Sequence, residues 1–206
     1  MQKKKSVMFI YFTCLVTAFL LGYFIQKIQT GLPSLIFKPP TVILNLVEVD
    51  YRGWWYFSSK ERPTRGKIGN YGAPLLLAFI FDIKNPNSYP ITMESLEFTV
   101  AFEEFDLKKV SSVENETIWI PPNKTARVRM SALFDVREAL LTVLKTGTAK
   151  LKKKKISHWG QLETWWITVP DLSFPIYVKD GSAEFKINDK IENIKFQGTY
   201  QEQHAN

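Results

Sequence analysis

The sequence is poor in the residues that catalysis, metal binding and covalent cross-links require. Cysteine occurs once, as Cys14, and histidine twice, as His158 and His204. A single cysteine excludes a disulfide within the chain and a cysteine-based metal site. A two-histidine metal site would need carboxylate ligands that the sequence pattern does not place, and neither a Ser/His/Asp spacing nor a phosphate-binding glycine loop is present. We therefore expect no enzyme, no cofactor and no metal site.

Charge is missing from residues 6–26, and acidic residues are missing from residues 1–27. As a helix, this apolar run spans roughly 30 Å, which matches the hydrocarbon core of a bilayer. The sequence therefore predicts one uncleaved transmembrane helix. A cleaved signal peptide is the alternative, but "LGYFIQK" is a poor cleavage site.

The lysines around this run predict its orientation. Lys3, Lys4 and Lys5 precede it and only Lys27 follows closely. By the positive-inside rule the N-terminus is cytoplasmic, and the C-terminal domain is periplasmic or otherwise extracytoplasmic. Without these four residues the chain has 23 basic and 20 acidic residues. An excess this small does not predict a nucleic-acid partner.

We expect four segments. Residues 1–27 form a cytoplasmic stub and the anchor, and residues 28–40 form a tether whose Gly and Pro residues break a helix. Residues 41–188 form a folded domain, and residues 189–206 form a C-terminal tail.

Apolar residues alternate through most of this domain, which predicts strands. One helix is expected over residues 135–147, with Asp135 as N-cap, Glu138 completing a capping box and Gly147 after the last turn. Asp180-Gly181 predicts a turn. The expected fold class is mainly β: a single N-terminal transmembrane helix followed by an antiparallel β-sandwich with one inserted α-helix. Strands are expected at residues 41–51, 75–83, 96–103, 117–122, 125–132, 148–156, 162–169, 174–178 and 183–187.

The stretch "NPNSYP" interrupts two of these strands, and its prolines and asparagines suit a structural turn. Pro86 has no N–H and ends ladder pairing, and it favours extended backbone at Asn85. Asn87 is expected to accept a hydrogen bond from the backbone two residues on, and Pro90 restarts an extended chain. We favour this interpretation over an asparagine-lined ligand site.

"KNPNSYPITMESLEF", residues 84–98, also resembles the late embryogenesis abundant group 2 family, whose domain is called WHy (water stress and hypersensitive response). The order of the expected elements over about residues 39–187 is similar to that family. The resemblance implies a folded, non-enzymatic β-sandwich, here in a membrane-anchored form. It implies stress protection or a role not yet assigned, and no catalytic residues.

Two groups of side chains are candidates for contact. Trp54, Trp55, Trp165 and Trp166 are too many large rings for all to be fully buried in a small domain, so we weigh core positions equally with a partner-contact surface. Lys152, Lys153, Lys154 and Lys155 are candidates for contact with anionic lipid or an acidic partner. For these lysines we favour a solvated edge strand, protected by its charges against pairing.

Three functions remain open. The first is a membrane-anchored extracytoplasmic binding or scaffold domain, an accessory subunit of a larger complex with other membrane proteins as partners. The second is a stand-alone stress-protective protein that shields membranes or clients. The third is a lipid binder or carrier, with lipid between the two sheets.

Overall fold

The computed structural model describes residue 17 and residues 37–55, 72–112, 117–187 and 190–201. The chain divides into two units, Met1–Phe37 and Lys38–Asn206. Apart from Thr17, the predicted anchor at residues 6–26 lies outside the described residues, as do Cys14 and His204. In the described part of the chain, no helix has the length and apolar character needed to cross a membrane.

One sheet of the second unit has three antiparallel strands in the order β1-β4-β8. These are β1 (Thr41–Tyr51), β4 (Leu75–Lys84) and β8 (Thr125–Phe134), and all three confirm predicted strands. Alternation in β8 buries Val128, Met130, Ala132 and Phe134. On the outer face, Arg129 forms ion pairs with Glu48 and Asp50 across the sheet.

The other sheet has β5 (Ile91–Phe102) near its centre. On one side β5 pairs with β6 (Phe105–Ser111) and β7 (Ile118–Ile120), and on the other with β9 (Ile176–Ile187). Beyond β9 lies β10 (Lys190–Tyr200), also antiparallel. Residues predicted to be a tail therefore form the edge strand of this sheet.

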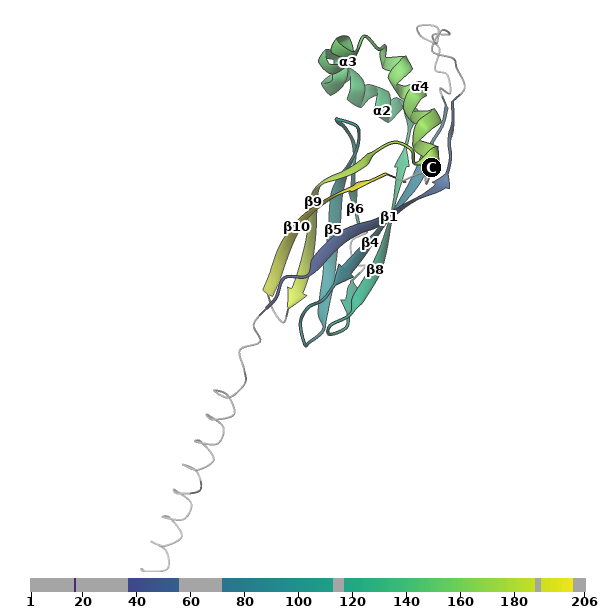
Figure 1. Ribbon diagram of the computed structural model, residues 1–206. Helices are drawn as coiled ribbons and strands as arrows, with labels where there is room; N and C mark the ends of the chain where they lie inside the picture. Colours follow the sequence, from purple (N-terminus) through teal and green to yellow (C-terminus); the bar gives the residue numbers. More distant parts are fainter. Residues whose placement is uncertain (1–16, 18–36, 56–71, 113–116, 188–189, 202–206) are drawn as a thin grey trace, which may run out of the picture. The chain divides into compact units, whose positions relative to one another are not determined.

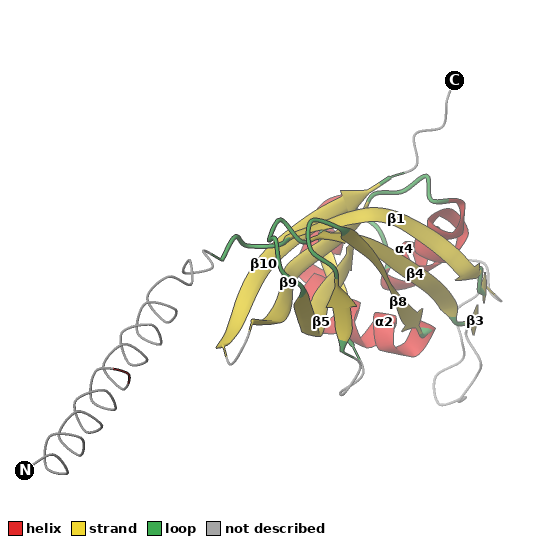
Figure 2. Cartoon of the chain, turned by 90° about the horizontal axis from the view of Figure 1, so that it is seen from below, coloured by secondary structure: helices red, strands yellow, loops and turns green. Residues whose placement is uncertain are grey.

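The two sheets pack against each other (Figure 2), and aromatic rings make contacts between them. Phe98 of β5 lies with its ring centroid 5.3 Å from that of Phe79 and 5.1 Å from that of Phe81, both in β4. Phe196 of β10 lies 5.5 Å from Phe81. The described domain is thus mainly β, with antiparallel sheets, as predicted.

Helices occupy one end of this sandwich (Figure 1). After β8 come α2 (Val136–Thr142), a π-helical stretch (Val143–Gly147) and α3 (Thr148–Lys154). Then follow α4 (His158–Thr168) and a short 3-10 turn (Val169–Asp171). The predicted helix over residues 135–147 covers α2 and the π-helical stretch, whereas α3, α4 and the 3-10 turn were not expected. The predicted strands at residues 148–156 and 162–169 are wrong.

The two strand predictions failed because residues that favour β-structure obscured the helical signals in these segments. Lys, Leu and Ala in α3 are good helix formers. Ser157 is the N-cap of α4, because its Oγ accepts a hydrogen bond from Gly160 N at 3.0 Å. Leu162, Trp165, Trp166 and Val169 recur at helical spacing and are all buried. The Trp, Ile, Thr and Val residues of this segment suggested a strand instead.

Two local predictions near the helices are corrected. Asp135 is the N-cap of α2, accepting from Arg137 N at 2.8 Å, but the Glu138 carboxylate pairs with Lys108 at 2.9 Å instead of closing a capping box. Gly147 does not end the helical run. A Cβ there would lie 2.5 Å from the Phe105 ring, so this close approach requires glycine.

Asp180-Gly181 is not a turn between two strands but lies within the continuous β9. Asp180 has φ 49°, and the pairing of β9 with both neighbours shifts at this point. This is a β-bulge, in which the extra residue accommodates a positive φ. The Phe196 ring packs on Gly181, where a Cβ would lie 2.5 Å from it.

The short β2 (Trp54–Trp55) and β3 (Gly72–Ala73) pair beside the helices. The loop that joins them in sequence lies outside the described residues.

Candidate functional site

The Asn-Pro-Asn motif lies at the end of the sandwich opposite the helices, where β4 ends and β5 begins. Asn85 is completely buried. Its Nδ2 donates to the carbonyl oxygens of Tyr89, Ile120 and Pro121 at 2.9, 3.2 and 3.1 Å. Its Oδ1 accepts from the N–H and from Nδ2 of Asn87, both at 2.9 Å. One amide therefore holds the motif to the β7–β8 connection.

Asn87 holds the point where the chain enters the domain. Its Oδ1 accepts from Lys38 N at 2.8 Å, and its Nδ2 donates to Lys38 O at 2.9 Å. The side chain thus pairs with this backbone as a neighbouring strand would. The prediction that Asn87 accepts a bond from the backbone two residues on is therefore wrong; the turn-closing bond of this kind runs instead from Asn87 N to Asn85 Oδ1. Both amides are used internally, so neither of them is free to bind a ligand.

The prolines of the motif lie where chain pairing stops and restarts. Pro86 follows the end of β4 by two residues, and Pro90 immediately precedes β5. The backbone groups beside them bond across to the β7–β8 turn: Asn85 N donates to Lys124 O at 2.9 Å, and Asn123 N donates to Asn87 O at 3.0 Å. The motif therefore closes this end of the sandwich.

The helices close the other end through buried tryptophan. Trp165 is fully buried, with its ring centroid 5.9 Å from that of Phe102 and 5.2 Å from that of Phe105. These two phenylalanines flank the β5–β6 turn. Trp166 is 3% exposed, and its Nε1 donates to Ala73 O at 2.9 Å. The prediction of a partner-contact surface therefore does not hold for Trp165 and Trp166, which belong to the core.

Of the other two tryptophans, one is partly buried against neighbouring rings and the other is exposed to solvent. Trp55 is half-buried, with its ring centroid 6.4 Å from those of both Trp159 and Trp166. Trp54 is 65% exposed. Of the four rings considered for contact, Trp54 is the one that presents most of its surface.

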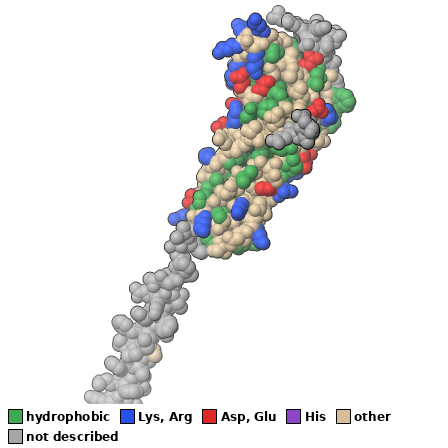
Figure 3. Space-filling view, viewed as in Figure 1, with side chains coloured by type: hydrophobic (Ala, Val, Ile, Leu, Met, Phe, Trp, Pro, Cys, Tyr) green, Lys and Arg blue, Asp and Glu red, His purple; other side chains and the backbone are tan. Residues whose placement is uncertain are grey.

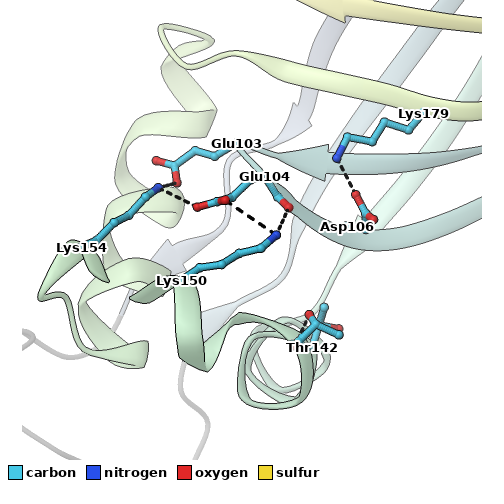
Figure 4. Close-up of polar contacts among 8 residues, drawn as sticks. Glu103, Glu104, Asp106, Thr142, Lys150, Lys154 and Lys179 are labelled. Atoms are coloured by element: carbon cyan, nitrogen blue, oxygen red, sulfur yellow. Dashed lines mark hydrogen bonds and ion pairs between the residues drawn. The ribbon is translucent and has the colours of Figure 1, made fainter. Parts of the chain in front are cut away.

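The lysine run is helical and uses one of its members internally (Figure 4). Lys154 Nζ lies 2.6 Å from Glu103 Oε2 and 3.5 Å from Glu104 Oε1. Lys150, one turn earlier, donates to Glu104 O at 2.9 Å. Both ammonium groups also lie over the Phe105 ring, at 5.3 Å for Lys150 and 5.7 Å for Lys154. These two lysines hold α3 against the β5–β6 turn.

This ion pair changes the proton affinity of Lys154. Its hydrogen bond to the Glu103 carboxylate raises the pKa of the ammonium above the ordinary lysine value of 10.5, while partial burial lowers it. The net shift of the Lys154 pKa is upward, so this ammonium holds its charge across the physiological range.

The remaining lysines of the run point to solvent. Lys152, Lys153 and Lys155 are exposed, as is Lys145 earlier in the same helical run. None of these four forms an ion pair with a described residue. The favoured interpretation of an edge strand is therefore wrong, while exposure of three members of the run agrees with the alternative, an anionic contact. Figure 3 shows Lys and Arg side chains gathered over the helices, with acidic side chains beneath them.

Exposed aliphatic side chains accompany these lysines. Leu141 is 67% exposed, Leu144 48% and Ile156 42%. The buried positions of α2 and the π-helical stretch are Val136, Ala139, Val143 and Gly147, and Leu144 is not among them. The one-residue register change of the π-helical stretch moves the apolar face, and the spacing of Leu residues alone did not reveal it. We call Leu141, Leu144, Lys145, Lys152, Lys153, Lys155 and Ile156 the helical-end surface.

The histidine that is described has a local role. The Nε2 of His158 lies 3.2 Å from Thr148 Oγ1, which joins the starts of α3 and α4. In the described part of the chain, no group of three or more His, Cys, Asp or Glu side chains is arranged to hold a metal ion.

Comparisons with known proteins assign no family. No family model and no curated protein matches the chain. A crystal structure of a protein from Archaeoglobus fulgidus is 12% identical, with a TM-score of 0.37, and covers 79% of this chain and 99% of its own. A crystal structure of a candidate ApaA protein from Bordetella pertussis is 10% identical, with a TM-score of 0.38, and covers 82% and 99%. The solution structure of a candidate late embryogenesis abundant protein is 12% identical, with a TM-score of 0.28, and covers 92% and 82%.

Proposed function

We propose that this chain is a non-enzymatic, membrane-anchored binding or scaffold domain outside the cytoplasm, and an accessory subunit of a larger membrane protein complex. Residues 6–26 form its anchor, with the N-terminus cytoplasmic. The charge-free run and the lysine distribution around it support this part of the proposal. We propose further that it is a membrane-anchored relative of the WHy domain. Two observations support this: residues 84–98 resemble that family, and they connect two antiparallel sheets of a mainly β domain.

The observation that carries the proposal is the separation of two specialised ends. Asn87 holds Lys38, the residue by which the chain enters the domain from the anchor side. Strand β5 begins near that end at Ile91 and reaches the helices at Phe102. At ~3.3 Å per residue such a strand measures roughly 35–40 Å. The sandwich thus supports a helical-end surface far from the tethered end, as a scaffold domain requires.

The interior supports a scaffold better than a lipid carrier. Side chains of Phe79, Phe81 and Phe98 make edge-to-face contacts between the sheets at 5.1 to 5.3 Å. Rings at these separations are in direct contact, so this part of the interior is filled by the chain itself.

The proposal is tested by purifying the full chain from native membranes in mild detergent. We expect it to co-migrate in constant stoichiometry with integral membrane proteins. Recovery as a lone monomer, with no partner in any detergent that preserves other native complexes, would overturn the scaffold proposal in favour of stand-alone protection.

The predicted topology is tested separately, by adding protease to intact spheroplasts of cells that make the chain. We expect digestion of the folded domain, and the same fragments from disrupted spheroplasts. A domain that is digested only after disruption would place it in the cytoplasm and refute the orientation.

A further inference from the structure

The helical end carries an excess of positive charge that the domain only partly neutralises. Residues 139–162 contain six lysines and no acidic residue. Glu103 and Glu104, from the β5–β6 turn, pair with Lys150 and Lys154. The other four lysines belong to the helical-end surface and have no ion-pair partner in the described part of the chain. The positive charge is therefore divided between an inner, paired face and an outer, unpaired one.

Stabilisation of the helix C-terminus accounts for some of these lysines, but it does not account for the exposed leucines in the same stretch of chain. Cations near a helix C-terminus interact favourably with the last carbonyl groups, and Lys152, Lys153 and Lys154 lie in the last turn of α3. That effect does not require Leu141 and Leu144 to be exposed at 67% and 48% on the preceding turns. Exposed aliphatic groups beside unpaired charges are typical of a surface that a partner covers.

We propose that the helical-end surface docks an acidic segment of a partner protein, with Leu141, Leu144 and Ile156 making apolar contact and Lys145, Lys152, Lys153 and Lys155 pairing with its carboxylates. This inference rests on the proposed scaffold function and names the chemistry of its partner. Four unpaired cations attract a segment of opposite charge and orient it, while the aliphatic groups contribute area that is removed from water.

A protein fits this position better than the bilayer that holds the anchor. The chain enters the domain at Lys38, and β5 separates that end from the helices along its whole length. The tethered end is thus the one joined covalently to the membrane.

The test is photo-crosslinking in native membranes, using the full chain. The probe is p-benzoylphenylalanine in place of Leu144, with a second variant carrying it in place of Leu141. We expect a crosslink to another protein, and we expect mass spectrometry to locate it in a peptide with net negative charge. Raising the salt concentration to about 0.5 M before irradiation should lower the crosslink yield, because it shortens the range of electrostatic attraction.

Charge reversal makes the test specific. In the Leu144 probe background, Lys152→Glu with Lys153→Glu and Lys155→Glu should reduce the crosslink yield at least about tenfold. The matched control is Lys84→Glu with Lys124→Glu and Lys186→Glu, three exposed lysines at the tethered end. We expect this control to retain the wild-type crosslink yield, although it changes the net charge of the chain by the same amount as the helical-end triple variant. A melting curve for each variant checks that the domain remains folded.

Several outcomes would overturn the inference. Crosslinks to lipid, supported by sedimentation of the chain with phosphatidylglycerol vesicles but not phosphatidylcholine vesicles, would identify a membrane surface instead. Crosslinks to a second copy of this chain would identify self-association. Equal loss in both triple variants would show a general charge effect. If the complex co-purifies unchanged with the helical-end lysines reversed, the inference fails and the scaffold proposal stands; if no complex exists, the scaffold proposal itself fails.

Discussion

At the end of the sandwich that holds the Asn-Pro-Asn motif, Asn85 and Asn87 are buried, and each polar atom of their amides is bonded to backbone or to the other amide. At the helical end, four lysines remain exposed and unpaired among the described residues. Buried atoms without a hydrogen-bond partner in the described part of the chain occur at both ends: Tyr89 Oη in the motif, and Gln161 Oε1 and Trp165 Nε1 in α4. The two asparagine amides are thus used entirely by the fold, whereas the lysine-rich stretch leaves four charged groups available for a partner.

The comparison predicts where substitutions unfold the domain and where they alter contacts. A side chain whose interactions are all internal should affect stability, and one that faces solvent without a partner should affect association only. The following predictions run from the largest expected effect to the smallest.

Trp165→Ala should lower the free energy of unfolding by about 3–5 kcal/mol, since it removes a fully buried ring from between Phe102 and Phe105. Denaturant unfolding of the detergent-solubilised chain measures this loss. Trp54→Ala, at a ring that is 65% exposed, is the control and should change stability by less than about 0.5 kcal/mol. Equal losses at the two positions would refute the assignment of Trp165 to the core.

Asn85→Ala should lower the free energy of unfolding by about 3 kcal/mol. It removes the donor for three carbonyl groups and the acceptor for Asn87, and buried groups left unpaired cost roughly 1–3 kcal/mol each. Asn45→Ala is the control, because its amide bonds Asp82 at an exposed site and its loss should cost far less. Crosslinking from position 144 should persist in the folded fraction. Loss of crosslinking with unchanged unfolding would instead make the motif a binding site.

The strands were predictable because their evidence is local. In β8 and β5 the period of two survives into the structure, with Val128, Met130, Leu96 and Phe98 buried on the inner faces. The position of the Asn-Pro-Asn motif between β4 and β5 followed from the geometry of proline. Its partners did not, because Lys38 and Ile120 lie far away in sequence and only the closed sandwich brings them to the two amides.

The secondary structure of the helical end was less predictable, because contacts between residues far apart in the sequence determine it. A lysine run can form an edge strand or a helix. The contacts that select the helix, Lys154 with Glu103 and Gly147 against Phe105, join residues about 40 or more positions apart. The period of α4 was visible in Leu162, Trp165 and Trp166, and Ser157 marked its start. Strand-favouring composition outweighed that signal in the prediction.

Gln161→Met is expected to stabilise the domain, whereas Trp165→Ala and Asn85→Ala are expected to destabilise it. Gln161 is 2% exposed and its Oε1 has no hydrogen-bond partner in the described part of the chain. Replacing a buried side chain whose oxygen is unpaired by an apolar side chain of similar length should raise the free energy of unfolding, by about 1 kcal/mol. Thermal or denaturant unfolding measures the change. A loss of more than about 1 kcal/mol would show that the amide is satisfied, and the contrast with Asn85 would fail.

Lys154→Met should lower the free energy of unfolding by about 0.5 kcal/mol, a small value because the pair with Glu103 is largely solvated. The pKa of Lys154 is raised in the folded state, so this contribution is fully present below the ordinary lysine value of 10.5 and is lost as pH rises through the higher folded value. The stability difference from wild type should therefore be constant between neutral pH and the ordinary lysine pKa, and narrow above it. A difference that already narrows near neutral pH would contradict this assignment.

Lys153→Met, the matched change one residue earlier, should lower the free energy of unfolding less than Lys154→Met does, because Lys153 is exposed and has no ion pair among the described residues. The same variant should lower the crosslink yield from position 144, since its charge faces the proposed acidic segment. Lys154→Met should have the opposite profile, with a measurable loss of stability and a near-normal yield. The two adjacent lysines would then show that the inner face of α3 stabilises the domain, while its outer face binds the partner. If both variants lower stability equally, or neither lowers the yield, the division between a paired inner face and a docking outer face is refuted.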